Sequence, residues 1–140
     1  MADVSARYLI DKSALARMPL AAVQARLAPI IEAGEAATCA IIDLEVLFSA
    51  RNQVEHARIR SRRKLAYVQV PLTEVIFQRA IDVQGELARL GQHRLPIPDL
   101  IVAAAAEAAG LTVLHYDADF DRIAAVTGQQ AEWVVPRGSV

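Results

Sequence analysis

Short β-prone runs alternate with longer helical stretches along most of the chain, and this alternation constrains the fold more than any other feature. Five strands are predicted at residues 7–10, 37–42, 67–70, 112–116 and 132–135. Strands that are separated by helices pair in parallel through right-handed crossovers, so their carboxyl ends share one edge of the sheet. The pattern therefore predicts an α/β three-layer sandwich around a central, mainly parallel sheet of about five strands.

The helical stretches carry their own start and stop signals. Helices are predicted at residues 20–33, 73–90 and 100–109. Pro29 lies inside the first and is expected to kink or split it, because a helix-interior proline removes one backbone hydrogen bond. The third lies between Pro98 and Gly110 and is apolar almost all round. We therefore expect it to be buried against the sheet.

Composition excludes several classes of protein. A chain of 140 residues and 15.2 kDa predicts one domain, 1–140, and 54% hydrophobic against 22% charged residues excludes a disordered chain. The longest apolar run, 100–106, is too short for a membrane span, and a cytoplasmic location is expected. A lone Cys39 and three scattered histidines cannot build a zinc cluster, and neither His93 nor His115 is assigned a role. Any metal site must use oxygen ligands.

Four acidic residues fall where the predicted sheet presents its carboxyl edge. Asp11 ends the first strand, Glu45 follows the second, and Asp117 follows the fourth. Asp99 opens the apolar helix, and helix amino termini gather at the same edge. We therefore expect these four carboxylates to converge although they are distant in sequence.

Such a cluster needs a cation. Two carboxylates about 4 Å apart repel each other by about 4 kcal/mol at an effective dielectric constant near 20. Oxygen ligands without convergent Cys or His favour Mg²⁺ or Mn²⁺ over zinc. A divalent ion can activate water and orient a phosphate, so the sequence points to phosphodiester cleavage.

Several neighbouring polar residues have two interpretations. Each acid taken alone is a good helix cap, and we interpret Asp43 as an N-cap and Glu45 as the inward ligand. Asp119 either joins the site across a turn or caps the helix that follows. Ser13 either orients a carboxylate, water or phosphate, or caps a helix.

Positive charge is concentrated between Arg51 and Lys64. This stretch has a local surplus of five positive charges, although the whole chain has a formal net charge of only -1. Beside an acidic metal site, such a patch suits a polyanion, and Arg58, Arg62 and Arg63 are the predicted substrate-binding residues. The alternatives are a solvated helix face and a docking site for an acidic partner protein.

The same segments resemble the PIN-domain family, in particular the VapC-type ribonuclease toxins of bacterial toxin–antitoxin pairs. The resemblance is carried by residues 8–14, 45–47, 98–103 and 115–121 and spans nearly the whole chain. It implies that the family's metal-binding and catalytic acids correspond to Asp11, Glu45, Asp99 and Asp117, with Asp119 as an additional ligand and Ser13 as a polar residue that binds substrate.

The resemblance also implies an activity and partners. It implies a Mg²⁺- or Mn²⁺-dependent endoribonuclease, a VapB-type antitoxin that covers the site, RNA as substrate, and a homodimer within a toxin–antitoxin hetero-oligomer. The alternative is a catalytically silent PIN-fold module that binds RNA or a protein partner, because a fold does not guarantee an activity.

Overall fold

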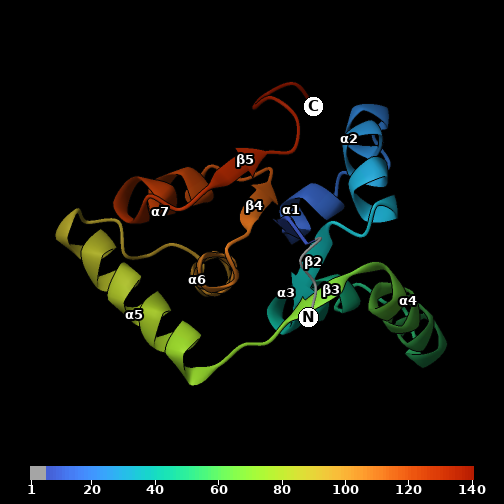
Figure 1. The fold of residues 1–140 in the computed structure, drawn as a ribbon, viewed down its shortest axis with the longest axis horizontal. Helices are drawn as coiled ribbons and strands as arrows, with labels where there is room; N and C mark the ends of the chain where they lie inside the picture. The colour runs from blue at the N-terminus through green and yellow to red at the C-terminus, as the bar shows by residue number, and fades with distance from the viewer. Residues whose placement is uncertain (1–5) are drawn as a thin grey trace.

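In the computed structural model, which describes residues 6–140, one five-stranded sheet forms the centre of the molecule (Figure 1). Its strands are β1 (Tyr8–Ile10), β2 (Ala36–Cys39), β3 (Val68–Val70), β4 (Thr112–His115) and β5 (Ala131–Trp133). The order is β3-β2-β1-β4-β5, and every neighbouring pair is parallel. The predicted fold class is confirmed.

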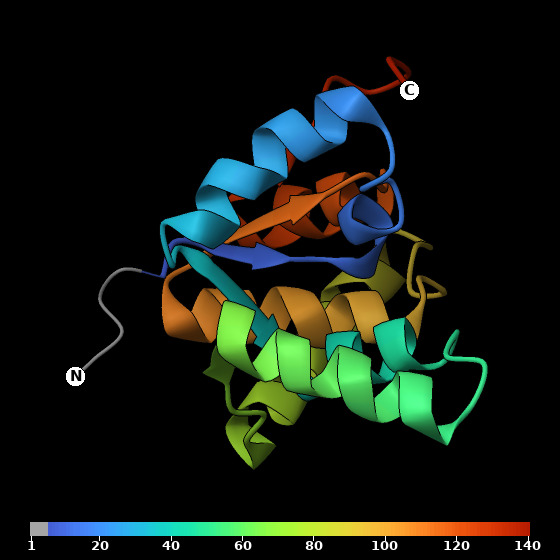
Figure 2. The same cartoon turned by 90° about the vertical axis from the view of Figure 1, so that its right-hand side faces the viewer.

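Helices cover both faces of this sheet (Figures 1 and 2). They are α1 (Lys12–Leu15), α2 (Ala21–Glu32), α3 (Ala40–Leu47), α4 (Gln53–Ala66), α5 (Glu74–Arg89), α6 (Ile97–Ala109) and α7 (Asp119–Thr127). Buried residues of α1 and α2 pack on one face, whereas those of α3, α5, α6 and α7 pack on the other. Helix α4 contacts α3 beside the β3 edge.

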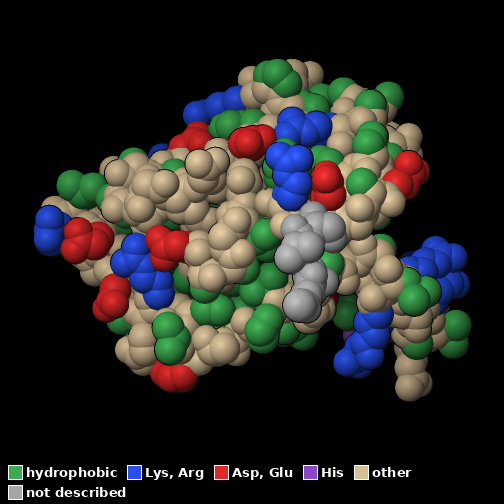
Figure 3. Space-filling view, in the orientation of Figure 1, with side chains coloured by type: hydrophobic (Ala, Val, Ile, Leu, Met, Phe, Trp, Pro, Cys, Tyr) green, Lys and Arg blue, Asp and Glu red, His purple; other side chains and the backbone are tan. Residues whose placement is uncertain are grey.

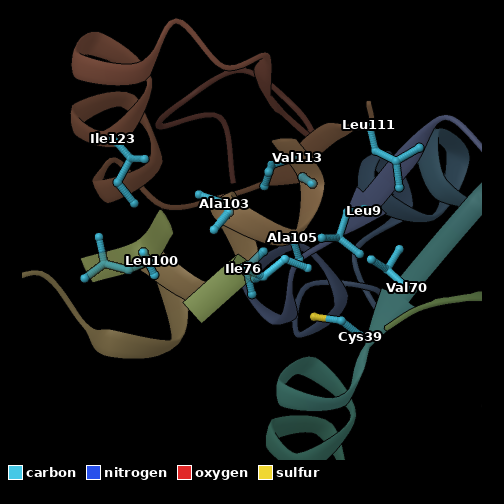
Figure 4. Close-up of a cluster of buried hydrophobic side chains, with 14 of the residues drawn as sticks. Leu9, Cys39, Val70, Ile76, Leu100, Ala103, Ala105, Leu111, Val113 and Ile123 are labelled. Carbon is cyan, nitrogen blue, oxygen red and sulfur yellow. The ribbon is translucent and has the colours of Figure 1, made fainter. Parts of the chain in front are cut away.

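Side-chain alternation along the strands supplies both cores. Leu9 belongs to the larger core and Ile10 to the smaller one, because successive strand residues point to opposite faces. Helix α6 lies across the larger core, where Ala103 and Ala105 allow a close approach to the strands (Figure 4). The continuous burial from Asp99 to Ala106 confirms the expected buried helix.

Two local predictions are wrong. The second strand ends at Cys39 rather than at residue 42, and α3 begins at once with Ala40. Helix α2 runs uninterrupted through Pro29. This proline lies in the last turn, where its missing N–H removes one bond while buried Val23 and Leu27 hold the helix on the sheet.

The carboxyl edge of the sheet is the edge that the acids share. Helix α6 runs antiparallel to the strands, so its first turn lies beside the carboxyl ends of β1 and β4 (Figure 2). Two hydrogen bonds join these strand ends: Asp11 N–H donates to the Leu114 carbonyl, and Tyr116 N–H donates to Ser13 Oγ, both at 2.9 Å. Within residues 6–140, no helix is both long and apolar enough to cross a bilayer.

Candidate metal centre

The two central strands each deliver an aspartate directly to the carboxyl edge. Asp11 follows β1, is only 4% exposed, and caps α1 by accepting the Ser13 N–H at 2.9 Å. Asp117 follows β4, and its Oδ1 accepts the Asp119 N–H at 2.9 Å. Each of these aspartates therefore accepts a hydrogen bond from the backbone two residues later, and each also lies at the predicted edge of the sheet.

Three carboxylates lie close enough together to hold a metal ion. Asp99, Asp117 and Asp119 each offer one oxygen, and these oxygens lie within 4.8 Å of one another. Asp99 opens α6 and is 7% exposed, and its Oδ2 is buried with no hydrogen-bond partner among residues 6–140. A buried carboxylate oxygen without a donor is costly, and a bound cation removes that cost.

The electrostatics of the cluster extend to all five predicted acids. Burial, followed by the charges of the other four acids, raises the pKa of Asp99 from 3.8 to about 8; the four are Asp11, Asp117, Asp119 and Glu45. Burial and the charge of Asp11 also raise the pKa of Glu45, whereas Lys12 opposes that shift. The donor set is oxygen only and strongly acidic, so the residues fit a hard divalent ion.

Asp43 and Glu45 both lie on α3, two residues apart, but their side chains have different partners. Asp43 is not the N-cap of this helix, because the strand ends early and Cys39 takes that position. The Asp43 carboxylate instead accepts hydrogen bonds from Thr38 Oγ1 at 2.9 Å and Arg63 Nε at 3.0 Å. Glu45 is therefore the α3 acid that interacts with the acidic cluster.

The structure decides between the two interpretations of Asp119. It lies in the first turn of α7 but does not cap it, because Ala118 is the N-cap and makes no side-chain cap bond. Its carboxylate joins the acidic cluster and also accepts from Arg122 at 2.7 Å. Among the described residues, Asp119 is thus the predicted ligand that forms a salt bridge with a side-chain cation.

His115 accepts a hydrogen bond from the backbone of Asp117, a contact that the sequence analysis did not predict. The side chain is buried, and its Nδ1 accepts the Asp117 N–H at 3.1 Å. This bond requires the unprotonated Nδ1, and burial lowers the pKa of the ring. The signal was available in the sequence, since His115 lies two residues before a predicted ligand.

The three predicted substrate-binding arginines lie in different environments. Arg58 and Arg62 are exposed on α4, where basic side chains gather (Figure 3). Arg63 is only 9% exposed and is paired with Asp43. A helix turns about 100° per residue, and this turn carries Arg63 into the interface with α3. Its predicted contact with RNA stays a prediction, and Arg63 is less accessible than Arg58 and Arg62.

A comparison with known families agrees with this geometry. The model of the PIN domain matches residues 8–126, a segment that includes all five acids of the cluster. The chain belongs to the PIN-domain family. It is 46% identical over 137 residues to Ribonuclease VapC21 of Mycobacterium tuberculosis, with 97% of this chain and 99% of that protein covered. Ribonuclease VapC51 of the same organism is also 46% identical, over 134 residues, with 96% and 97% covered.

Solved structures share the PIN-domain fold. DNA-bound VapBC from Salmonella typhimurium matches with a TM-score of 0.72 and 16% identity, covering 93% of this chain and 99% of that one. At this identity, the likeness concerns the fold alone. The resemblance read from the sequence is confirmed at the level of the family.

Proposed function

We propose that this PIN-domain protein is a metal-dependent endoribonuclease and the toxin of a type II toxin–antitoxin pair. The observation that carries the proposal is the acidic cluster around Asp99, whose buried Oδ2 has no partner among the described residues. The identity to proteins named ribonuclease supports RNA as the substrate class. The alignments cover 99% and 97% of these two relatives, so the similarity is not limited to one part of them.

Each acid has a role in this proposal. All five acids are proposed metal ligands: oxygens of Asp99, Asp117 and Asp119 lie within 4.8 Å of one another, and the charges of Asp11 and Glu45 also act on Asp99. Mg²⁺ is the favoured ion and Mn²⁺ the alternative; when bound, the ion supplies a water of lowered pKa and neutralises charge on the phosphate. Ser13 and His115 hold the backbone at Tyr116 and Asp117 through hydrogen bonds.

Partners and location follow from the same proposal. A VapB-type antitoxin is the expected inhibitor, and the solved structures with this fold include several VapBC complexes. We expect the toxin to form a homodimer within a toxin–antitoxin hetero-oligomer in the cytoplasm. The exposed Arg58 and Arg62 of α4 are proposed contacts for the RNA backbone.

The test is a cleavage assay with the antitoxin-free protein. Total RNA is incubated with wild type, Asp99→Ala or Glu32→Ala, each with Mg²⁺ or with chelator. We expect cleavage only by wild type and Glu32→Ala with Mg²⁺, because exposed Glu32 ends α2 and takes no part in the acidic cluster. RNA binding without any cleavage would favour the catalytically silent module, and equal cleavage in all lanes would place the activity outside this cluster.

A further inference from the structure

A pocket lies between α3 and α4, outside the acidic cluster. Its volume is about 580 Å³, within the usual size of ligand pockets of about 300–1,000 Å³. The α3–α4 pocket, as we call it, is lined among others by Leu44, Leu47, Arg60, Arg63, Lys64 and Tyr67. It therefore combines apolar walls with several cations.

Arg63 and Asp43, which we call the floor of this pocket, form a salt bridge with each other. Arg63 donates from Nε to Asp43 at 3.0 Å and from Nη2 to Thr38 Oγ1 at 2.9 Å. Its guanidinium also lies 4.5 Å from the centre of the Tyr67 ring. Because Asp43 is the only acid lining the pocket and Arg63 neutralises it, the floor contributes almost no net charge.

The wall formed by α4 is strongly basic. His56, Arg60 and Lys64 line the pocket at intervals of four residues, so they form one stripe on a single helix face. All three are exposed, and within residues 6–140 neither Arg60 nor Lys64 forms a salt bridge. The pocket thus has a positive wall whose charge no protein carboxylate balances.

One residue, Leu44, links the α3–α4 pocket to a smaller hollow beside the proposed catalytic edge. This second hollow, of about 350 Å³, is lined by Lys12, Leu44, Glu45 and Phe48. Leu44 lines both hollows, and the carboxylate of Glu45 interacts with Asp11 in the acidic cluster. A chain molecule lying on α3 can therefore contact the basic stripe and the acidic cluster together.

We propose that the α3–α4 pocket binds a nucleotide of the RNA substrate that flanks the cleaved bond. Arg60 and Lys64 contact its phosphate, while Tyr67 and the two leucines of α3 pack against its base. The inference rests on the proposed nuclease function. RNA is favoured over a peptide because the pocket combines two exposed cations, which suit a phosphate, with apolar and aromatic side chains, which suit a base.

The first experiment measures RNA affinity without cleavage. A labelled single-stranded RNA of mixed sequence is titrated in chelator with wild type and with Arg60→Gln/Lys64→Gln, and anisotropy is followed at several salt concentrations. We expect at least about fivefold weaker binding and a salt slope that is shallower by about 1.4, since each phosphate contact on single strands contributes about 0.7. The control Arg7→Gln/Arg26→Gln removes the same charge near Tyr8, at the amino end of β1, and should change affinity less than twofold.

A second experiment locates the RNA. The same RNA carrying 4-thiouridine is photo-crosslinked to wild type, and the attached peptides are identified by mass spectrometry. We expect cross-links in α3 and in the segment from α4 to Tyr67. Cross-links only elsewhere, or equal losses of affinity in both double variants, would overturn the subsite. So would an Arg60→Gln/Lys64→Gln variant that binds RNA normally but is no longer inhibited by the antitoxin. Because binding is measured in chelator, failure of wild type to cleave RNA would count only against the nuclease function.

Discussion

Two aspartates of this protein, Asp99 and Asp43, are kept from water in opposite ways. Asp43 accepts hydrogen bonds from Arg63 and Thr38, so the chain itself supplies the neutralising cation. The charges that act on Asp99 are those of other acids, and burial together with these charges raises its pKa to about 8. This difference supports the proposed role of Asp99 as a metal ligand, because a buried carboxylate without a partner lowers the stability of the fold.

The largest effect is expected from substitution of Asp99, whose buried Oδ2 has no hydrogen-bond partner among the described residues. Asp99→Asn should lower RNA cleavage more than about 100-fold, because even outer-shell partners of metal ligands are worth about 10- to 100-fold. The same variant should raise the free energy of unfolding of the metal-free protein at pH 8, because the amide carries no charge. Cleavage assays and urea denaturation in chelator measure both effects. A less stable variant would show that the Asp99 charge stabilises the fold.

The reverse outcome is expected at Asp43. Asp43→Asn should lower the free energy of unfolding by about 2–3 kcal/mol, because Arg63 is left nearly buried without its carboxylate. Urea denaturation measures this loss, and Asp43→Asn/Arg63→Met should recover much of it by removing the unpaired cation as well. A single variant as stable as wild type would mean that water compensates Arg63 fully.

Metal binding should depend on pH through Asp99. A proton and the metal compete for this carboxylate, so metal affinity should rise by up to about tenfold per pH unit as pH approaches 8. Without metal the sign is opposite for stability: the folded state holds the proton more tightly than the unfolded chain, so stability falls as pH rises from about 4 to about 8. Calorimetric titration with Mg²⁺ at pH 6, 7 and 8 tests the first, and urea denaturation in chelator tests the second. A pH-independent affinity would exclude Asp99 as a ligand.

The smallest effect concerns the edge of the Asp43 network. Gln69 donates to Asp43 Oδ2 at 3.3 Å from an exposed position. Gln69→Ala should therefore lower the free energy of unfolding by less than about 0.5 kcal/mol, as for most surface substitutions. A loss as large as that of Asp43→Asn would mean that Gln69, rather than Arg63, carries the network. Urea denaturation of the two variants side by side makes the comparison.

The wrong interpretation of Asp43 as a helix cap has a physical origin. Asp43 was interpreted as a cap because the second strand was expected to reach residue 42, whereas β2 ends at Cys39. Because α3 begins at Ala40, Asp43 lies within the helix rather than at its start. Its carboxylate there forms a salt bridge with Arg63, while Glu45 interacts with the acidic cluster. Element boundaries depend on packing against neighbours that are distant in sequence, and a local pattern of residue types carries little information about them.

The sequence by itself determined the parallel α/β sandwich, the shared edge for the acids and the PIN-domain family, because hydrophobic periodicity and strand-end positions are local properties. Only the tertiary structure decided which charges have partners. It buried Arg63 against Asp43 and left Arg60 and Lys64 on the wall of a pocket. The sequence gives the charge of each side chain. Whether that charge has a partner depends on which faces of two helices pack together, as for Arg63 of α4 and Asp43 of α3.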